Sequence, residues 1–149
     1  MKYEGFIKEA GLDEKNFRWA WAFCNEVNAE ITEPELADEL LDLVLQGKKT
    51  ATASALLDYG PDEPLPTVDG KFDILLDGQG QPRAAITTSK VYIKKFTEVT
   101  EQHAFKEGEG DRSLAYWRQV HQEFWGGFKL FNPEMEVVCE EFKVLYAKK

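Results

Sequence analysis

The spacing of apolar and polar positions predicts one clearly amphipathic helix early in the chain. Thr32 with Glu35 three residues later forms a capping-box pattern, and Pro34 suits the first helical turn. Gly47 ends the helix. The apolar positions recur at helical spacing: Leu36, Ala37, Leu40, Leu41, Val44 and Leu45.

Later segments alternate between apolar and polar residues and predict strands. Residues 71–76 form the first strand, Asp77-Gly78-Gln79-Gly80 a hairpin turn, and residues 83–96 a long strand or pair of strands. Residues 136–146 alternate again and predict a closing strand. Residues 59–66 hold three prolines and two acids, which predicts an exposed loop.

Three further segments are predicted to be helical. Asp13 is a candidate N-cap for a helix to about Glu26, although its aromatic residues recur at every second position, which suits a helix poorly. Residues 100–106 predict a short helix, and Asp111 or Ser113 caps another through Trp125. Interleaved helices and hairpin-linked strands predict a single α+β domain over residues 1–149, with a small, mostly antiparallel β-barrel flanked by helices.

Composition narrows the classes of function. The 149 residues have a net charge of −9, which argues against a protein that coats long nucleic acid. Residues 47–95, with six acids and seven bases, are the part that does not repel an anion. No apolar run is long enough for a membrane span, and Cys24 and Cys139 are expected to be reduced and buried. A cytoplasmic protein without a membrane partner is expected.

The segment Gly47-Lys48-Lys49-Thr50-Ala51-Thr52 is the strongest candidate for chemistry. A helix end followed by two lysines and two threonines can present backbone N–H groups, an ammonium and a hydroxyl to an anion or a polarised carbonyl. The structural alternative is a C-cap glycine with lysines placed favourably against the helix dipole.

Two other features carry titratable groups. His103 lies on a short polar helix and is expected to be exposed, whereas His121, between two tryptophans one turn away on either side, is expected to be half-buried. The acidic turn Glu107-Gly108-Glu109-Gly110-Asp111 is either a helix-to-helix connection or a site for a cation. It lacks the calcium-loop pattern, and we expect no metal and no cofactor.

Taken together, these motifs resemble the ASCH domain family, in its bacterial stand-alone branch, whose fold is similar to the PUA barrel of RNA-modifying proteins. The resemblance covers nearly the whole chain. It depends on five segments: the helix leading into residues 47–52, Pro64-Leu65-Pro66 with Val68-Asp69-Gly70, the strands of residues 86–96, the acidic turn of residues 107–111, and Ser113-Leu114 with Trp117-Arg118.

The resemblance implies a role with RNA or nucleosides. Some members are amidohydrolases that remove an acyl group from acetylated cytidine with a lysine, a threonine and a glutamate. The lysine and threonine correspond to Lys49 and Thr52 as catalytic residues, and the glutamate is assigned to the position of Thr87. Another member is a metal-dependent ribonuclease. The expected ligand-binding residues are Lys48, Thr50, Thr87, Glu107, Glu109 and Asp111.

Three functions remain open from the sequence. The first is binding of RNA or a modified nucleoside, with hydrolysis through Lys49 and Thr52 and backbone N–H groups near Thr50 as an oxyanion hole. The others are a noncatalytic RNA-binding module and a small-molecule-sensing module. A nucleoside or short single-stranded RNA is the expected partner, and the sequence leaves the oligomeric state open.

Overall fold

In the computed structural model, the chain folds around one five-stranded sheet with the strand order β1-β3-β4-β5-β2. The structure describes residues 1–24, 31–127 and 129–148. The strands are β1 (Phe17–Trp21), β2 (Ala51–Ala55), β3 (Phe72–Leu76), β4 (Pro82–Lys95) and β5 (Glu136–Ala147). The α-helices are α1 (Glu4–Glu9), α2 (Pro34–Leu45), α3 (Glu101–Glu107) and α4 (Leu114–Gly127). Short 3-10 helices span Glu14–Asn16, Leu56–Asp58 and Phe96–Glu98.

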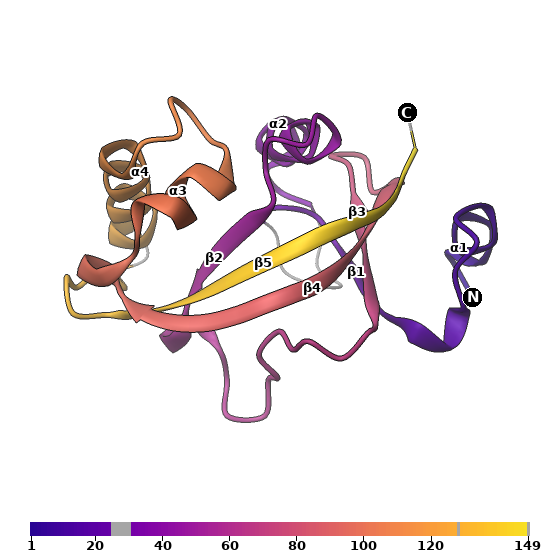
Figure 1. The fold of residues 1–149 in the computed structure, drawn as a ribbon, viewed down its shortest axis with the longest axis horizontal. Coiled ribbons are helices and arrows are strands. Elements are labelled where there is room, and N and C mark those ends of the chain that lie inside the picture. Colours follow the sequence, from indigo (N-terminus) through magenta and orange to yellow (C-terminus); the bar gives the residue numbers. More distant parts are fainter. Residues whose placement is uncertain (25–30, 128, 149) are drawn as a thin grey trace.

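The sheet is mostly antiparallel, because only the pairing of β1 with β3 is parallel. The α+β class predicted from the sequence is therefore confirmed. The sheet does not close, since β1 and β2 form its two edges, so the expected barrel is only approximated. The long strands β4 and β5 cross the molecule diagonally and carry the other elements (Figure 1).

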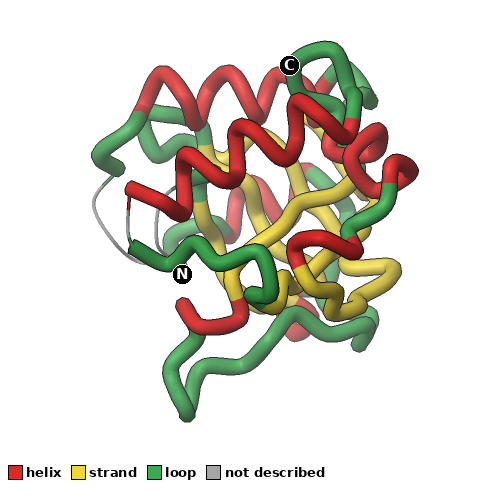
Figure 2. Tube along the Cα trace, turned by 90° about the vertical axis from the view of Figure 1, so that its left-hand side faces the viewer, coloured by secondary structure: helices red, strands yellow, loops and turns green. Residues whose placement is uncertain are grey.

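The helices cover different parts of this sheet. Helices α3 and α4 lie together at one end of β4 and β5, α2 lies beside the middle, and α1 lies at the opposite end (Figure 1). Figure 2 shows the strands from the side, with the long loop that precedes β3 extending away from them. Three apolar clusters result: one under α3 and α4, one under α2, and one beside α1.

Alternation along β5 separates two of these clusters. Val137 and Cys139 pack with the residues of α3 and α4, whereas Phe142 packs with those of α2. Because successive strand residues point to opposite faces, we call the side of Phe142 the α2 face and the other side the α4 face. The polar side chains of the protein divide between these two faces.

The segment around the first tryptophans differs from the sequence prediction. The helix expected from Asp13 is wrong: Asp13 caps only the 3-10 helix, and residues 17–21 form β1. The aromatic alternation that suits a helix poorly is the period of a strand. The predicted end at Glu26 lies outside the described residues. The short helix α1 carries no strong apolar pattern and was not predicted.

Helix α2 has the predicted apolar face, but a different N-terminus. Glu33 occupies the N-cap position without a side-chain cap, so the capping box expected from Thr32 is wrong. The hairpin turn after β3 and the C-terminal strand are confirmed. Cys139 is buried as expected, whereas Cys24 is exposed.

The close approach of Gly108 to the chain before β2 gives a stability prediction. Gly108 ends α3 at φ +72°, and a Cβ there would overlap the carbonyl of Lys48. Gly47 has a similar φ of +80° but open space around it. Gly47→Ala should therefore cost about 1 kcal/mol of unfolding free energy from the left-handed conformation alone, and Gly108→Ala clearly more. Urea unfolding of both variants measures this, and equal losses would contradict the predicted close contact.

Candidate functional site

The turn between α2 and β2 directs Lys49 into the protein. Gly47 adopts a left-handed conformation, and the backbone N–H groups of Lys48 and Lys49 both donate to the carbonyl of Leu43. The side chain of Lys49 is 1% exposed, although it follows a surface helix end directly. Lys49 is therefore not a surface lysine that merely compensates the helix dipole.

The ammonium of Lys49 has partners on every side. It donates to Glu109 Oε2 at 2.9 Å and to the carbonyl of Ala51 at 3.0 Å. Glu107 Oε1 lies 3.8 Å away, and the ring centroid of Phe23 lies 5.3 Å away. A third hydrogen bond, to the carbonyl of Glu107 at 3.5 Å, completes the donors of this buried ammonium, and two carboxylates lie near it.

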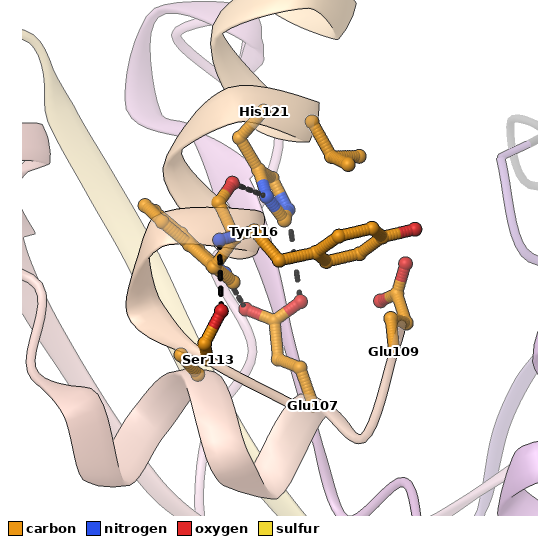
Figure 3. A pocket seen from close by; sticks show the side chains of 8 residues that line it. Glu107, Glu109, Ser113, Tyr116 and His121 are labelled. Carbon is orange, nitrogen blue, oxygen red and sulfur yellow. Dashed lines mark hydrogen bonds and ion pairs between the residues drawn. The ribbon is translucent and has the colours of Figure 1, made fainter. Parts of the chain in front are cut away.

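Glu107 is the centre of the cluster around this lysine. Its carboxyl is 1% exposed and accepts hydrogen bonds from His103 Nε2 and Trp117 Nε1, both at 2.5 Å. His121 Nε2 lies 3.6 Å from its other oxygen (Figure 3). Burial alone would raise the pKa of Glu107, but the hydrogen bond of His103 and the charge of Lys49 hold it well below its usual value.

The cluster is built from two helix pairs at i, i+4 spacing. His103 and Glu107 share one face of α3, while Trp117 and His121 share one face of α4 and stack with centroids 4.2 Å apart. The hydroxyl of Thr100 caps α3 by accepting from the backbone N–H of His103. Residues four apart lie on the same helix face, so the spacing in the sequence indicates that the side chains of each pair are neighbours.

The burial of His103 contradicts the sequence expectation that it is exposed. It is 1% exposed, and its second nitrogen, Nδ1, lies 3.0 Å from the hydroxyl of Tyr92 on β4. One face of this polar helix is buried, and the polar side chains on it, His103 and Glu107, bind each other. His121, in contrast, is half-buried as expected.

A small cavity adjoins the cluster. Its volume of about 10 Å³ holds about one water molecule. Glu107, Glu109, Ser113, Tyr116 and His121 are among the residues that line it (Figure 3). Glu109 is 21% exposed at its side chain, so the carboxylate that binds Lys49 directly also reaches solvent.

The other predicted site residues are placed differently. Thr52 lies half-buried on β2, opposite Glu140 of β5. Asp111 is exposed and accepts from the backbone N–H of Ser113, which is a capping role. Lys48 is exposed and bonds through its carbonyl to Arg112.

Two threonines also have backbone partners. The N–H of Thr50 donates to the carbonyl of Lys106, so this N–H is not available to an oxyanion. The hydroxyl of Thr87 donates to the carbonyl of Lys71. The carboxylates beside Lys49 are Glu107 and Glu109, and Thr87 on β4 takes no part in that contact.

The acidic segment of residues 107–111 supplies the partners of the lysine. Glu107 and Glu109 bring carboxylates to Lys49, whereas Asp111 serves as a cap and connects to the next helix. Within the part of the chain that the structure describes, no group of three or more His, Cys, Asp or Glu is arranged to hold a metal ion. None of its described helices has the length and apolar character to cross a membrane.

Fold and site together define a PUA-like α+β protein with a buried lysine–carboxylate centre at the edge of an open sheet. The sequence model of the ASCH domain matches residues 19–146, and this chain belongs to the ASCH domain family. The PUA-like fold of this family is generally linked to RNA binding.

Two solved structures support this assignment. A protein of Enterococcus faecalis, described by the family model DUF984, is 35% identical over 95% of this chain and 84% of its own, with a TM-score of 0.75. An ASCH domain from Lactobacillus crispatus is 25% identical over 97% of this chain and 94% of its own, with a TM-score of 0.78. Among curated proteins, none matches this chain.

The lowered pKa of Glu107 predicts how stability depends on pH. A carboxyl with a lower pKa in the folded state stabilises the fold above its unfolded value near 4.5, and this contribution is lost as the pH falls further. Glu107→Gln should cost about 3 kcal/mol at pH 7, because it leaves Lys49 less well compensated. The Glu107→Gln variant should also lose less unfolding free energy than the wild type as the pH falls below 4.5.

Urea unfolding between pH 7 and pH 3 measures both effects. Glu109→Gln is the matched control, since it removes a more exposed carboxylate from the same lysine and should cost less. An unchanged pH profile in Glu107→Gln would show that this carboxyl is not held ionised in the folded protein.

Proposed function

We propose that this ASCH-domain protein binds a nucleoside or a short single-stranded RNA and hydrolyses an acyl group on the base through Lys49 and Thr52. Glu107, rather than the position of Thr87, supplies the carboxylate. The observation that carries the proposal is the burial of the Lys49 ammonium between the carboxylates of Glu107 and Glu109.

A buried ion pair is a poor means of stabilising a fold. Desolvation of both charges offsets much of their attraction, and apolar residues of similar size often stabilise as well or better. Lys49 and Glu107 are nevertheless both 1% exposed, and Glu107 also contacts two histidines and a tryptophan. A buried carboxyl whose pKa is strongly shifted, as that of Glu107 is, is typical of functional sites.

The position of Thr52 supports its pairing with Lys49. The Lys49 ammonium lies 5.3 Å from the ring centroid of Phe23, and Phe23 packs with Phe142 on the α2 face. Thr52 pairs with Glu140, which shares that face of β5 with Phe142. The ammonium and the Thr52 hydroxyl are therefore expected to approach the same side of the sheet. Their direct contact is part of the proposal.

The reaction follows from these groups. Loss of a proton from the Lys49 ammonium to solvent leaves an amine that accepts the Thr52 hydroxyl proton, while the ionised carboxylates of Glu107 and Glu109 hold this amine in place. Thr52 Oγ1 attacks the acyl carbonyl, the C–N bond breaks, and Lys49 returns the proton to the leaving amine. Water then cleaves the acyl-threonine ester, which yields a carboxylic acid and free Thr52.

One observation favours a noncatalytic RNA-binding or small-molecule-sensing module instead. The cavity beside Glu107 has room for about one water molecule, so no nucleoside fits inside it as the structure stands. A ligand in that case would contact Glu109 and Tyr116, two lining residues that reach solvent, and Lys49 would hold Glu109 in place without reacting. This alternative predicts binding without turnover.

The catalytic proposal is tested with N4-acylated cytidine as substrate. Thr52→Val removes the hydroxyl from a half-buried strand position at nearly constant volume, and should lower kcat at least about 100-fold. Lys49→Ala should have a similar effect, with folding checked by circular dichroism because this side chain is buried. Thr87→Val is the matched control on β4 and should retain activity.

The outcomes separate the two candidate functions. Turnover that depends on Thr52 and Lys49 supports the hydrolase. Saturable nucleoside binding with no turnover, weakened only modestly in Lys49→Ala, indicates the noncatalytic module. Equal turnover in Thr52→Val would exclude Thr52 as nucleophile.

The charge of the protein gives a further prediction about the form of the ligand. With a net charge of −9, the surface should repel long duplexes, so free nucleosides or short single strands should bind better. Anisotropy titrations with a labelled duplex and a labelled short strand, at moderate salt, measure the difference. Tight and steeply salt-dependent binding of the duplex would contradict this prediction.

A further inference from the structure

A second group of polar side chains crosses the α2 face of the sheet, apart from the lysine centre. Arg18 Nε donates to Asp73 Oδ1 at 2.8 Å, and its terminal nitrogen donates to the hydroxyl of Thr88 at 3.1 Å. That hydroxyl donates to Glu140 Oε2 at 2.7 Å, and Trp21 Nε1 donates to Asp73 Oδ2 at 3.0 Å. We call this set, Arg18, Trp21, Asp73, Thr88 and Glu140, the transverse network.

The transverse network links four strands and ends at the fifth. Its members come from β1, β3, β4 and β5, and Glu140 lies directly opposite Thr52 of β2. Opposite residues of an antiparallel pair have Cβ atoms about 5 Å apart on the same face. The proposed nucleophile and the Glu140 carboxyl are therefore neighbours.

The polar groups are enclosed by the fold. Asp73 is 4% exposed, Thr88 5% and Glu140 7%, whereas Thr52 and Ser54 on the edge strand are half-buried. The network thus runs from the interior to a partly open end at β2. Tyr59, whose hydroxyl lies 2.8 Å from that of Ser54, is close enough for the Glu140 charge to affect its pKa.

Glu140 retains an acceptor at this open end. The hydrogen bond that the structure gives its carboxyl, among the described residues, uses Oε2 and comes from Thr88. None of the hydrogen bonds found among residues 1–24, 31–127 and 129–148 uses Oε1, which can accept one from a ligand. Burial raises the pKa of Glu140, and the negative charge of Asp73 acts in the same direction. A hydrogen-bond donor from a ligand would offset the free-energy cost of burying this carboxylate.

We propose that Glu140 is the residue that selects the base: its Oε1 accepts a hydrogen bond from the exocyclic amino or acylamino N–H of a nucleobase whose substituent faces Thr52. Carboxylates of Glu and Asp recognise the cytosine N4 amino group in the same way in nucleic-acid complexes. Thr88 acts as the positioning residue, because its hydroxyl fixes which carboxyl oxygen is left for the ligand.

This assignment fits the charges of the transverse network. Arg18 is paired with Asp73 and further approached by Asp69 at 3.6 Å, so its charge is compensated and does not call for a phosphate. A neutral base edge, rather than an anion, suits a face with these acids. The proposal deepens the proposed function by naming what holds the base while Thr52 meets the acyl group.

Binding measurements test it independently of catalysis. Calorimetric titrations of the full chain with cytidine and with uridine compare two nucleosides that differ in the exocyclic amino group. The wild-type protein should bind cytidine at least about tenfold more tightly. In Glu140→Gln, the side-chain oxygen is taken by Thr88 and an NH₂ donor faces the ligand, so this ratio should fall to near one.

Glu141→Gln is the matched control. Glu141 is the next residue on β5, points to the opposite face and binds Lys106 at the surface. Its cytidine-to-uridine ratio should match that of the wild type. Thermal unfolding of both variants shows whether a loss of the cytidine-to-uridine ratio is due to misfolding. The preference of the wild-type protein for cytidine is measured without any substitution, so it is not affected by misfolding of a variant.

Each outcome decides between the two ideas. A ratio that depends on Glu140 supports base selection even when no substrate is turned over, in which case only the hydrolase proposal fails. Turnover with equal binding of cytidine and uridine would overturn the role of Glu140 and leave the hydrolase standing. Absence of nucleoside binding in the wild type would overturn base selection.

Discussion

The buried contact between Lys49 and the acids of the α3–α4 turn is the constraint on which the rest of the site depends. Two chain segments far apart in sequence must meet for this ammonium to be satisfied. The backbone enforces the meeting, since the N–H of Thr50 donates to Lys106 and the carbonyl of Lys48 accepts from Arg112. Gly108 is required where these segments touch, because any side chain there would overlap the Lys48 carbonyl. The ion pairs of Lys49 and these backbone contacts together hold the start of the edge strand β2 against the helices.

The edge strand β2 of the open sheet has different surroundings on its two faces. On the α4 face, an apolar cluster of tryptophans and strand residues supports the helices that carry His103, Glu107 and His121. On the α2 face, apolar packing covers one part of the sheet and the transverse network occupies another. Strand alternation on β2 and β5 assigns each side chain to one face. A closed barrel would bury this edge, whereas the open sheet leaves Thr52 half-buried on the edge strand, opposite Glu140 of the transverse network.

How far the sequence predicts this arrangement depends on how local the determining contacts are. Helix α2, the hairpin after β3 and the turn at Gly47 follow from short-range pattern, and all are found. The burial of His103 does not follow, because its partners Tyr92 and Trp117 come from other elements. Glu140 and Glu141 look alike in sequence as two acids in a strand. Their roles separate only when register places one opposite Thr52 and the other beside Lys106.

Electrostatics connects the two polar groups to the kind of ligand that the protein can hold. In both groups, each buried cation already lies against carboxylates: Lys49 against Glu107 and Glu109, and Arg18 against Asp73. A phosphate would have to displace these acids and would also meet a protein of net charge −9. A neutral base needs neither displacement nor counterions, and it gains from fixed donors and acceptors that are already oriented. The charge distribution disfavours contact with a nucleic-acid backbone, and the proposed recognition through the base does not require such contact.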